Sequence, residues 1–151
     1  MSSLQPEVKW PNDLVVHSKK LAGILIETKI SGSKIGYAIV GVGLNVNLST
    51  KELPVGATSI LMDTCRKIDL EETLGSVLSA FAKHYKRLWD PRSIMSEWWN
   101  HCFHRMKAVR INTGNRLIKG KCIGVNSDGT LNVETDNGIV PVTNGTLRLD
   151  T

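Results

Sequence analysis

The polar side chains best suited to bind an anion or a nucleotide gather in residues 9–47. Lys20 stands at the edge of an apolar run, where a lysine either packs its stem on a sheet or points its charge into a pocket for a carboxylate or phosphate. Asn45 ends a later apolar run and carries the donor and acceptor that pair with an adenine edge. Taken one residue at a time, a surface lysine and a turn asparagine are the favoured interpretations.

Two backbone patterns accompany these residues. Pro11-Asn12-Asp13 is a compact polar turn, because proline sets φ and the next two side chains can bond the local backbone; alone, it favours a turn without a ligand. Gly41 and Gly43 lie two residues apart in a strand, so their missing side chains leave a groove for a flat or linear ligand. The spacing is not that of a dinucleotide-binding loop, since valine replaces the third glycine and these glycines close a strand instead of opening a helix.

Hydrophobic periodicity predicts the strands that position these residues. Strands are expected over residues 7–10, 14–16, 21–27 and 34–46, and Ser31-Gly32-Ser33 joins the last two as a hairpin. Gly23 and Leu25 belong to the third of these strands. A glycine in a strand interior marks a bend or the close approach of a ligand or backbone.

Two helices are predicted after a loop over residues 48–62. Asp69 begins the first helix, and Glu72 three residues later completes a capping box. Asp90-Pro91 ends it, and a shorter helix is expected over about residues 93–102. An apolar face at helical spacing is more often core than cofactor site, so we expect the two helices to cover one face of the sheet. The residues of that face are Leu70, Leu74, Val77, Leu78, Phe81, Tyr85, Leu88 and Trp89.

From residue 105 the sequence changes to short alternating strands. Three dipeptides typical of hairpins occur in quick succession, Asp128-Gly129, Asn137-Gly138 and Asn144-Gly145. They separate expected strands over residues 108–112, 116–125, 130–135, 138–143 and 146–149, a pattern that predicts a small SH3-like barrel. The expected fold class is therefore α+β, with one domain over residues 1–104 and a β domain over residues 105–151.

Composition narrows the class of protein. Hydrophobic content of 41% and charged content of 22% are ordinary for a soluble globular protein, and no apolar run approaches the roughly 18 residues of a membrane span. The first residues lack the regions of a signal peptide, and three scattered cysteines indicate a reducing compartment, the cytoplasm. The net charge of +5 weakly favours anionic partners. His101 and His104 stand three apart without further ligands, so no metal site is expected there.

Three motifs in order resemble those of the biotin–protein ligase family: K-W-P-N-D at 9–13, K-L-A-G-I-L at 20–25 and G-V-G-L-N-V-N at 41–47. Their combination is specific, although each piece alone is not. G-A-T-S at 56–59 resembles a further segment of many members. The resemblance covers essentially the whole chain, as the C-terminal half of the catalytic domain followed by the family's SH3-like domain. It implies a biotin/lipoate ligase-like mixed sheet with covering helices.

The resemblance also implies an activity. The family joins biotin to ATP, giving biotinyl-5′-adenylate and pyrophosphate, and passes the biotinyl group to a lysine of a biotin carboxyl carrier protein. Lys20 matches the motif lysine beside the biotin carboxylate and the α-phosphate, where its charge stabilises attack on phosphorus. Asn12 and Asn45 match positions that border adenine and ribose, and Asp13 matches the phosphate and Mg²⁺ end. The residues that match the wall of the biotin tail channel are Gly23, Leu25, Gly41 and Gly43.

The first half of the family's catalytic domain carries a glycine–arginine loop over the adenylate, and this sequence has no Gly-Arg dipeptide. We therefore expect the site to be incomplete in this chain alone. The expected partners are a complementing N-terminal ligase half or a second copy, paired at a sheet edge, besides the carrier protein; no membrane or nucleic acid is expected. Two alternatives stay open: a lipoate–protein ligase relative, which K-W-P-N-D disfavours, and a non-catalytic module that binds the carrier domain.

Overall fold

The computed structural model describes residues 4–150, which form two compact units. One unit comprises residues 4–6 and 12–68, and the other comprises residues 7–11 and 69–150; residues 1–3 and 151 lie outside the described residues. Both predicted helices thus belong with the C-terminal strands. The predicted domain division between residues 104 and 105 stays a prediction.

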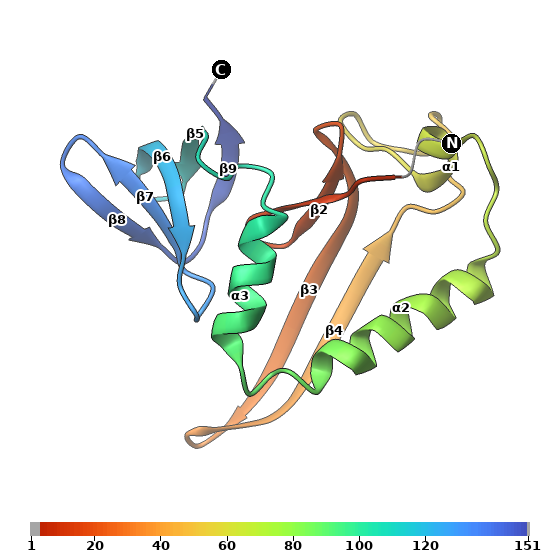
Figure 1. The fold of residues 1–151 in the computed structure, drawn as a ribbon, viewed down its shortest axis with the longest axis horizontal. Coiled ribbons are helices and arrows are strands. Elements are labelled where there is room, and N and C mark those ends of the chain that lie inside the picture. The colour runs from red at the N-terminus through yellow and green to blue at the C-terminus, as the bar shows by residue number, and fades with distance from the viewer. Residues whose placement is uncertain (1–3, 151) are drawn as a thin grey trace. The chain divides into compact units, whose positions relative to one another are not determined.

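The first unit is an antiparallel sheet of β2 (Asp13–Val16), β3 (Lys19–Ser31) and β4 (Lys34–Leu44), visible as a long hairpin in Figure 1. These strands confirm the sequence prediction, although β3 extends beyond both of its expected ends. The tip turns at Gly32, whose φ of 62° suits glycine. A short helix that the sequence reading missed, α1 (Ile60–Thr64), begins inside the predicted loop and extends past its expected end.

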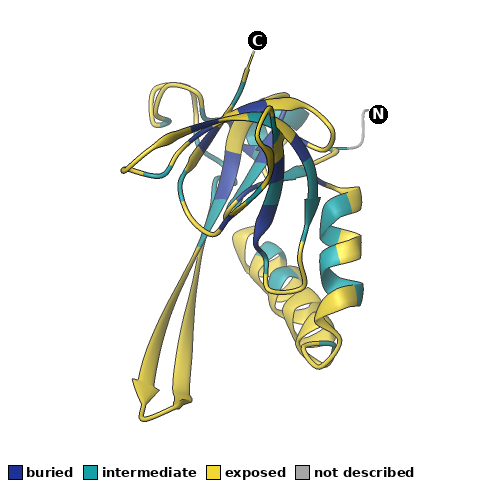
Figure 2. Cartoon of the chain, turned by 90° about the vertical axis from the view of Figure 1, so that its left-hand side faces the viewer, coloured by how far each residue is buried: buried dark blue, intermediate teal, exposed yellow. Residues whose placement is uncertain are grey.

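The long hairpin leaves many of its apolar side chains in solvent. Figure 2 shows its outer part as exposed throughout, whereas burial in this unit concentrates near Val15, Val16 and Leu21. The hairpin's large apolar side chains that are more than half exposed are Leu25, Ile26, Ile30, Ile35, Tyr37 and Ile39. A strand pair that is apolar on both faces is typical of a sheet interior, so this hairpin presents a surface suited to burial.

The second unit begins its C-terminal part with two helices, α2 (Leu70–Tyr85) and α3 (Pro91–Asn100). The predicted cap is confirmed, because the Asp69 side chain accepts from the Glu72 amide at 2.9 Å. The predicted burial of the α2 face is wrong: α2 has no buried residue, and Phe81 is 49% exposed. Helical spacing determines which side chains share a face but not what covers them.

The five predicted C-terminal strands are confirmed to within a residue, as β5 (Ala108–Asn112), β6 (Leu117–Val125), β7 (Leu131–Thr135), β8 (Gly138–Val142) and β9 (Thr146–Leu149). They form one antiparallel sheet in the order β8-β7-β6-β5-β9 (Figure 1). This order ends at β8 and β9, so the described strands form no closed barrel. The architecture is mixed α/β with antiparallel sheets, and the finer SH3-like assignment stays a prediction.

Alternation along these strands builds the core of the second unit. Val109 and Ile111 are fully buried while Arg110 between them is exposed, as the two-residue period of a strand requires. β1 (Glu7–Lys9) joins this unit through hydrogen bonds of Val8 with the segment after α3. Trp10 follows β1 into the core, and its indole N–H donates to the Gly129 carbonyl at 3.2 Å. Among residues 4–150, every helix is too short or too polar to cross a membrane.

Candidate functional site

An open groove of about 440 Å³ lies on the hairpin of the first unit. The residues that line it are Asn12, Lys20, Gly23, Ile24, Leu25, Gly41, Val42 and Gly43. The structure therefore brings together most of the predicted site residues, which come from the turn before β2 and from both strands of the hairpin.

Lys20 and Asp13 form an ion pair at this groove, with Lys20 Nζ 2.5 Å from Asp13 Oδ1. The side chain of Lys20 is 51% exposed and that of Asp13 23%, so the ammonium group keeps access to a ligand in the groove. A pair this exposed contributes little to stability. Its consequence is positional, because the carboxylate holds the flexible lysine stem toward the groove.

Gly23 provides the room for this ion pair. A Cβ atom on Gly23 would lie 3.0 Å from Lys20 Nζ and 3.4 Å from Asp13 Oδ1. At Gly41 and Gly43 an added Cβ would make only ordinary contacts, at 3.7 and 3.9 Å from backbone oxygens. Gly23 pairs with Gly43 across the hairpin, and Leu25 pairs with Gly41. The four residues therefore share one face of the hairpin and form the floor of the groove.

The two predicted nucleotide-binding asparagines have different surroundings. Asn12 lines the groove, and its Nδ2 donates to the Ile24 carbonyl at 2.8 Å while the Ile24 amide donates to the Asn12 carbonyl at 2.9 Å. Asn45 lies beyond the end of β4, where its Nδ2 donates to the Thr58 carbonyl at 3.0 Å. Asn12 is thus fixed to β3 at the groove, whereas Asn45 anchors the segment that follows. Their predicted contacts with adenine and ribose stay predictions.

The segment 56–59 fixes the backbone of Lys20. The Lys20 amide donates to the Gly56 carbonyl at 2.9 Å, and the Thr58 amide donates to the Lys20 carbonyl at 2.8 Å. Thr58 and Ser59 are almost fully buried, and the Ser59 hydroxyl caps α1 by accepting from the Met62 amide. The sequence reading noted this segment only by resemblance. The signal that was available is a serine before an apolar helical run, which is a typical N-cap.

A buried cluster in the second unit escaped the sequence reading. His104 is fully buried, and its Nδ1 lies 3.2 Å from the sulfurs of both Cys102 and Cys122. Its Nε2 accepts from the Trp10 amide at 3.0 Å. Within residues 4–150 no group of side chains is arranged to hold a metal ion. Sequence spacing gave no signal because β6 supplies Cys122 from 18 residues beyond His104.

The two thiols of this cluster differ in acidity. The hydrogen bond from Cys122, and next those from His104, outweigh burial and lower the pKa of Cys102 from 9.0 to about 5. The hydrogen bond with Cys102, and next burial, raise the pKa of Cys122 above its usual value. The hydrogen bond between the two sulfurs thus favours the ionised form of Cys102 and the protonated form of Cys122.

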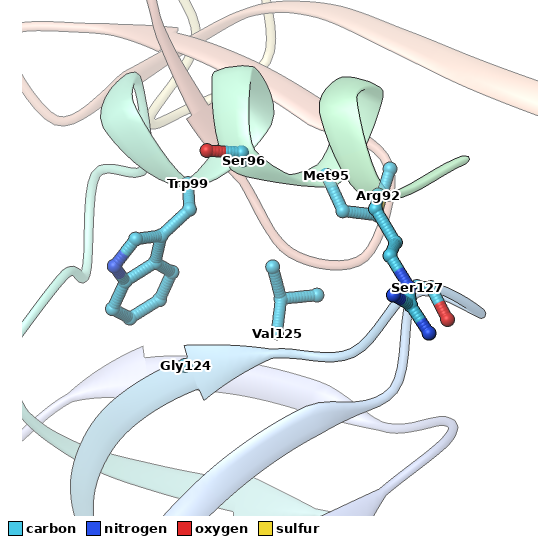
Figure 3. Close-up of a pocket in the computed structure, with 7 residues that line it drawn as sticks. All are labelled: Arg92, Met95, Ser96, Trp99, Gly124, Val125 and Ser127. Carbon is cyan, nitrogen blue, oxygen red and sulfur yellow. The ribbon is translucent and has the colours of Figure 1, made fainter. Parts of the chain in front are cut away.

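A second groove, of about 260 Å³, lies between α3 and the end of β6. Figure 3 shows Trp99 and Met95 of α3 facing Val125, with Arg92 at the end near Ser127. None of the predicted site residues lines it, and its mixed apolar and polar lining indicates no particular ligand.

Comparisons with known proteins agree on one family. Residues 2–45 match the model of the Biotin/lipoate A/B protein ligase family. The chain is 28% identical to the bifunctional ligase/repressor BirA of Bacillus spizizenii, over 98% of this chain and 47% of that protein. It is 32% identical to the biotin–[acetyl-CoA-carboxylase] ligase of Paracoccus denitrificans, over 82% of this chain and 55% of that protein.

A solved structure extends the likeness to the fold. The biotin protein ligase of Aquifex aeolicus, in complex with biotin and ATP, superimposes with a TM-score of 0.81 at 27% identity. The match covers 96% of this chain and 62% of that one. The chain spans about half the length of the curated relatives it matches. Motifs, fold and relatives agree, and the chain belongs to the biotin–protein ligase family.

Proposed function

We propose that the chain supplies one half of a biotin–protein ligase, which activates biotin as biotinyl-5′-AMP and transfers it to a lysine of a biotin carboxyl carrier protein. The observation that carries the proposal is the Lys20–Asp13 pair over a floor of glycines. A cation at one end of an apolar channel suits a linear acid whose carboxylate must meet a phosphate.

Lys20 has a defined part in the proposed chemistry. A biotin carboxylate oxygen attacks the α-phosphorus of ATP, a P–O bond forms, and the bond to pyrophosphate breaks. Both reactants are anionic, so the Lys20 ammonium lowers their repulsion and stabilises the charge that builds on the phosphoryl oxygens. In the second step the carrier lysine amine attacks the acyl carbon and AMP leaves.

The floor and walls of the groove have a second role in the proposed function. The Gly23–Gly43 and Leu25–Gly41 pairs leave room for a narrow alkyl chain beside the strand backbones. Beside the groove, the carboxylate of Asp13, paired with Lys20, could serve as a ligand to the implied Mg²⁺. That suits an ion that takes one or two carboxylates and completes its shell with substrate phosphates and water.

The proposal includes finer features that the resemblance implies. The second-unit sheet would serve as the family's SH3-like domain, supported by five short antiparallel strands with alternating burial. Asn45 would border the nucleotide from its place beside Thr58. The site would work in the cytoplasm, where the resting state of the two thiols of the buried cluster is the reduced one.

We also propose that a complementing half completes the site. We use this term for the part of a biotin–protein ligase that this chain does not match, in whichever polypeptide it resides. Two exposed apolar surfaces support it, one on the β3–β4 hairpin and one on α2, and each belongs to a separate unit. Apolar surface of this extent on a soluble protein marks an interface. Pairing of a second copy at the same surface is the competing outcome.

Calorimetric titration with a non-hydrolysable biotinyl-adenylate analogue tests the proposal. We expect one-to-one binding when the complementing half of a family member is added to the folded chain, and weaker binding without it. Binding that is equally absent with and without the complementing half, in a chain shown to be folded, would exclude the proposed site.

The lipoate–protein ligase alternative follows from the family model itself, which covers both biotin and lipoate ligases. Competition between biotin and lipoate for adenylate formation separates the two, because a biotin site must accommodate a bicyclic ureido ring. A non-catalytic module would instead bind the carrier protein and release no pyrophosphate in either assay.

A further inference from the structure

The buried cluster of Cys102, His104 and Cys122 has no part in the proposed ligase chemistry. Its tautomer follows from its contacts: Nε2 accepts the Trp10 amide proton at 3.0 Å, so a neutral imidazole carries its proton on Nδ1. That proton faces sulfur, since Nδ1 lies 3.2 Å from each thiol. The imidazole is therefore held as a donor to the cysteine pair.

The two sulfurs occupy different positions around the ring. Cys102 Sγ lies 3.2 Å from Nδ1 and 3.7 Å from Nε2. A sulfur in the ring plane opposite one nitrogen would be much farther from the other, so Cys102 lies over the ring face. This leaves Cys122 to accept from Nδ1–H and to donate its own S–H to Cys102. The chain of donors makes Cys102 the ionised and nucleophilic member.

Backbone hydrogen bonds hold the two cysteines beside each other. The Cys122 amide donates to the Lys107 carbonyl at 3.0 Å, and the Met106 amide donates to the Cys122 carbonyl at 2.9 Å. The segment after α3 is thereby bonded to β6 next to the thiol pair. Both sulfurs lie 3.2 Å from the same imidazole nitrogen, so they are at most twice that distance apart.

We propose that Cys102 and Cys122 form a peroxide-sensitive dithiol, which a small peroxide oxidises to an intramolecular disulfide. The Cys102 thiolate attacks hydrogen peroxide, an S–O bond forms, the O–O bond breaks, and the departing hydroxide becomes water after protonation. The Cys122 sulfur then attacks the sulfenic sulfur, the S–O bond breaks, and a second water leaves with the Cys122 proton. Overall, two thiols and one peroxide give one disulfide and two waters. Cys102 is 5% exposed, so a small oxidant such as hydrogen peroxide can reach its sulfur more readily than a bulky disulfide reagent can.

Tryptic mapping tests this directly, because the three cysteines lie on three different tryptic peptides. The folded protein is treated with stoichiometric hydrogen peroxide, and its remaining thiols are alkylated in denaturant. We expect the Cys102 and Cys122 peptides to be joined, with a mass lower by two hydrogen atoms, and to separate again with dithiothreitol. The exposed Cys65 should remain mostly alkylated, although it is the most accessible of the three.

Substitutions make the result specific. Cys65→Ser should keep the cross-link, and Cys122→Ser should leave a sulfenic acid on Cys102 that dimedone traps. His104→Asn should slow the loss of the Cys102 thiol by about tenfold, because it removes the donor that orients Cys122 toward the Cys102 thiolate. Oxidation confined to Cys65, with both Cys102 and Cys122 alkylated in the wild-type protein, would overturn the proposal. So would a cross-link that forms only after unfolding.

Discussion

At the scale of single residues, Lys20 presents a charge that the fold hardly needs. Its ion pair with Asp13 is half exposed, and such pairs contribute about 0–1 kcal/mol to stability. Lys20→Ala should therefore leave the urea midpoint almost unchanged while lowering pyrophosphate release, in the presence of the complementing half, on the order of 100-fold.

Lys19 is the matched control for this substitution. It precedes Lys20 in β3 and is exposed, but it does not line the groove. Lys19→Ala should retain activity within about twofold, since an exposed charge outside the site is screened by solvent. Equal losses in the two variants would remove Lys20 from the site.

A substitution at Gly23 tests the same site by adding a methyl group beside Lys20. Alanine fits its strand backbone, yet the new Cβ would lie 3.0 Å from Lys20 Nζ and displace it. Gly23→Ala should weaken binding of the adenylate analogue by about tenfold, roughly 1.4 kcal/mol, with little change in thermal midpoint. Gly36→Ala is the control on the same hairpin, where an added Cβ meets only Lys29 O at 3.4 Å. Calorimetric affinities for the two variants should differ; a common value would mean that Gly23 does not define the position of Lys20.

The cysteine pair predicts how stability depends on pH. The pKa of Cys102 is lowered in the folded state, so its contribution is complete above the unfolded value of 9.0 and is lost as pH falls toward 5. The raised pKa of Cys122 acts in the opposite sense, and its contribution is lost above pH 9. The titratable groups that face Cys102 are His104, on the same segment, and Cys122 of β6.

Urea unfolding between pH 6 and about 8.5 measures this effect. In a Cys65→Ser background the free energy of unfolding should rise with pH, because the unfolded chain binds the proton that folded Cys102 has lost. Adding Cys102→Ser should flatten the rise. If the free energy of unfolding still rises with pH in the variant that carries both Cys65→Ser and Cys102→Ser, the rise belongs to other titratable groups.

At the scale of elements, the sequence predicted where helices and strands form more accurately than it predicted which of their faces are buried. The Asp69 cap and the glycine turns of the C-terminal hairpins depend on neighbouring residues, so local chemistry was sufficient to place α2 and the strands β5–β9. Burial depends on what lies opposite an element. The face of α2 follows the helical period, but the described residues bring no surface over it, and Leu74 is 58% exposed.

Contacts between distant strands were equally hidden from the sequence. Gly120 of β6 shows no turn signal, yet an added Cβ would clash with the Glu134 carbonyl oxygen of β7. Gly120→Ala should destabilise the protein by about 1–3 kcal/mol, since two paired backbones must separate to accept a methyl group. Gly75→Ala in α2, with nothing within 4 Å, should instead stabilise by up to about 1 kcal/mol. Thermal midpoints that move in the same direction would contradict the packing of β6 on β7.

At the scale of the whole molecule, the candidate site was predictable to the extent that its motifs are contiguous. K-W-P-N-D and K-L-A-G-I-L supplied Asn12, Lys20 and Gly23, and the groove contains all three. The Asp13–Lys20 ion pair depends on a register shift between Leu14 and Val15, which no residue pattern announces. The buried cluster depends on tertiary contacts alone, so it too lay beyond sequence reasoning.

The exposed apolar surfaces predict how the protein assembles. Ile30 of β3 and Leu78 of α2 are 67% and 57% exposed. The two substitutions Ile30→Lys and Leu78→Lys, made separately, should therefore reduce association more than they reduce folding stability. Light scattering over a concentration series should give masses above the monomer for the wild-type chain, and a one-to-one complex once the complementing half is present.

Val55 is the matched control, an apolar side chain that is fully exposed on a loop and belongs to none of β3, β4 and α2. Val55→Lys should associate as the wild type does, because an isolated apolar side chain buries too little area to hold a partner. If only the hairpin variant loses association, the partner pairs with the sheet; if only the α2 variant does, it covers the helix. A wild-type chain that stays monomeric at every concentration and ignores the complementing half would show that neither surface is an interface.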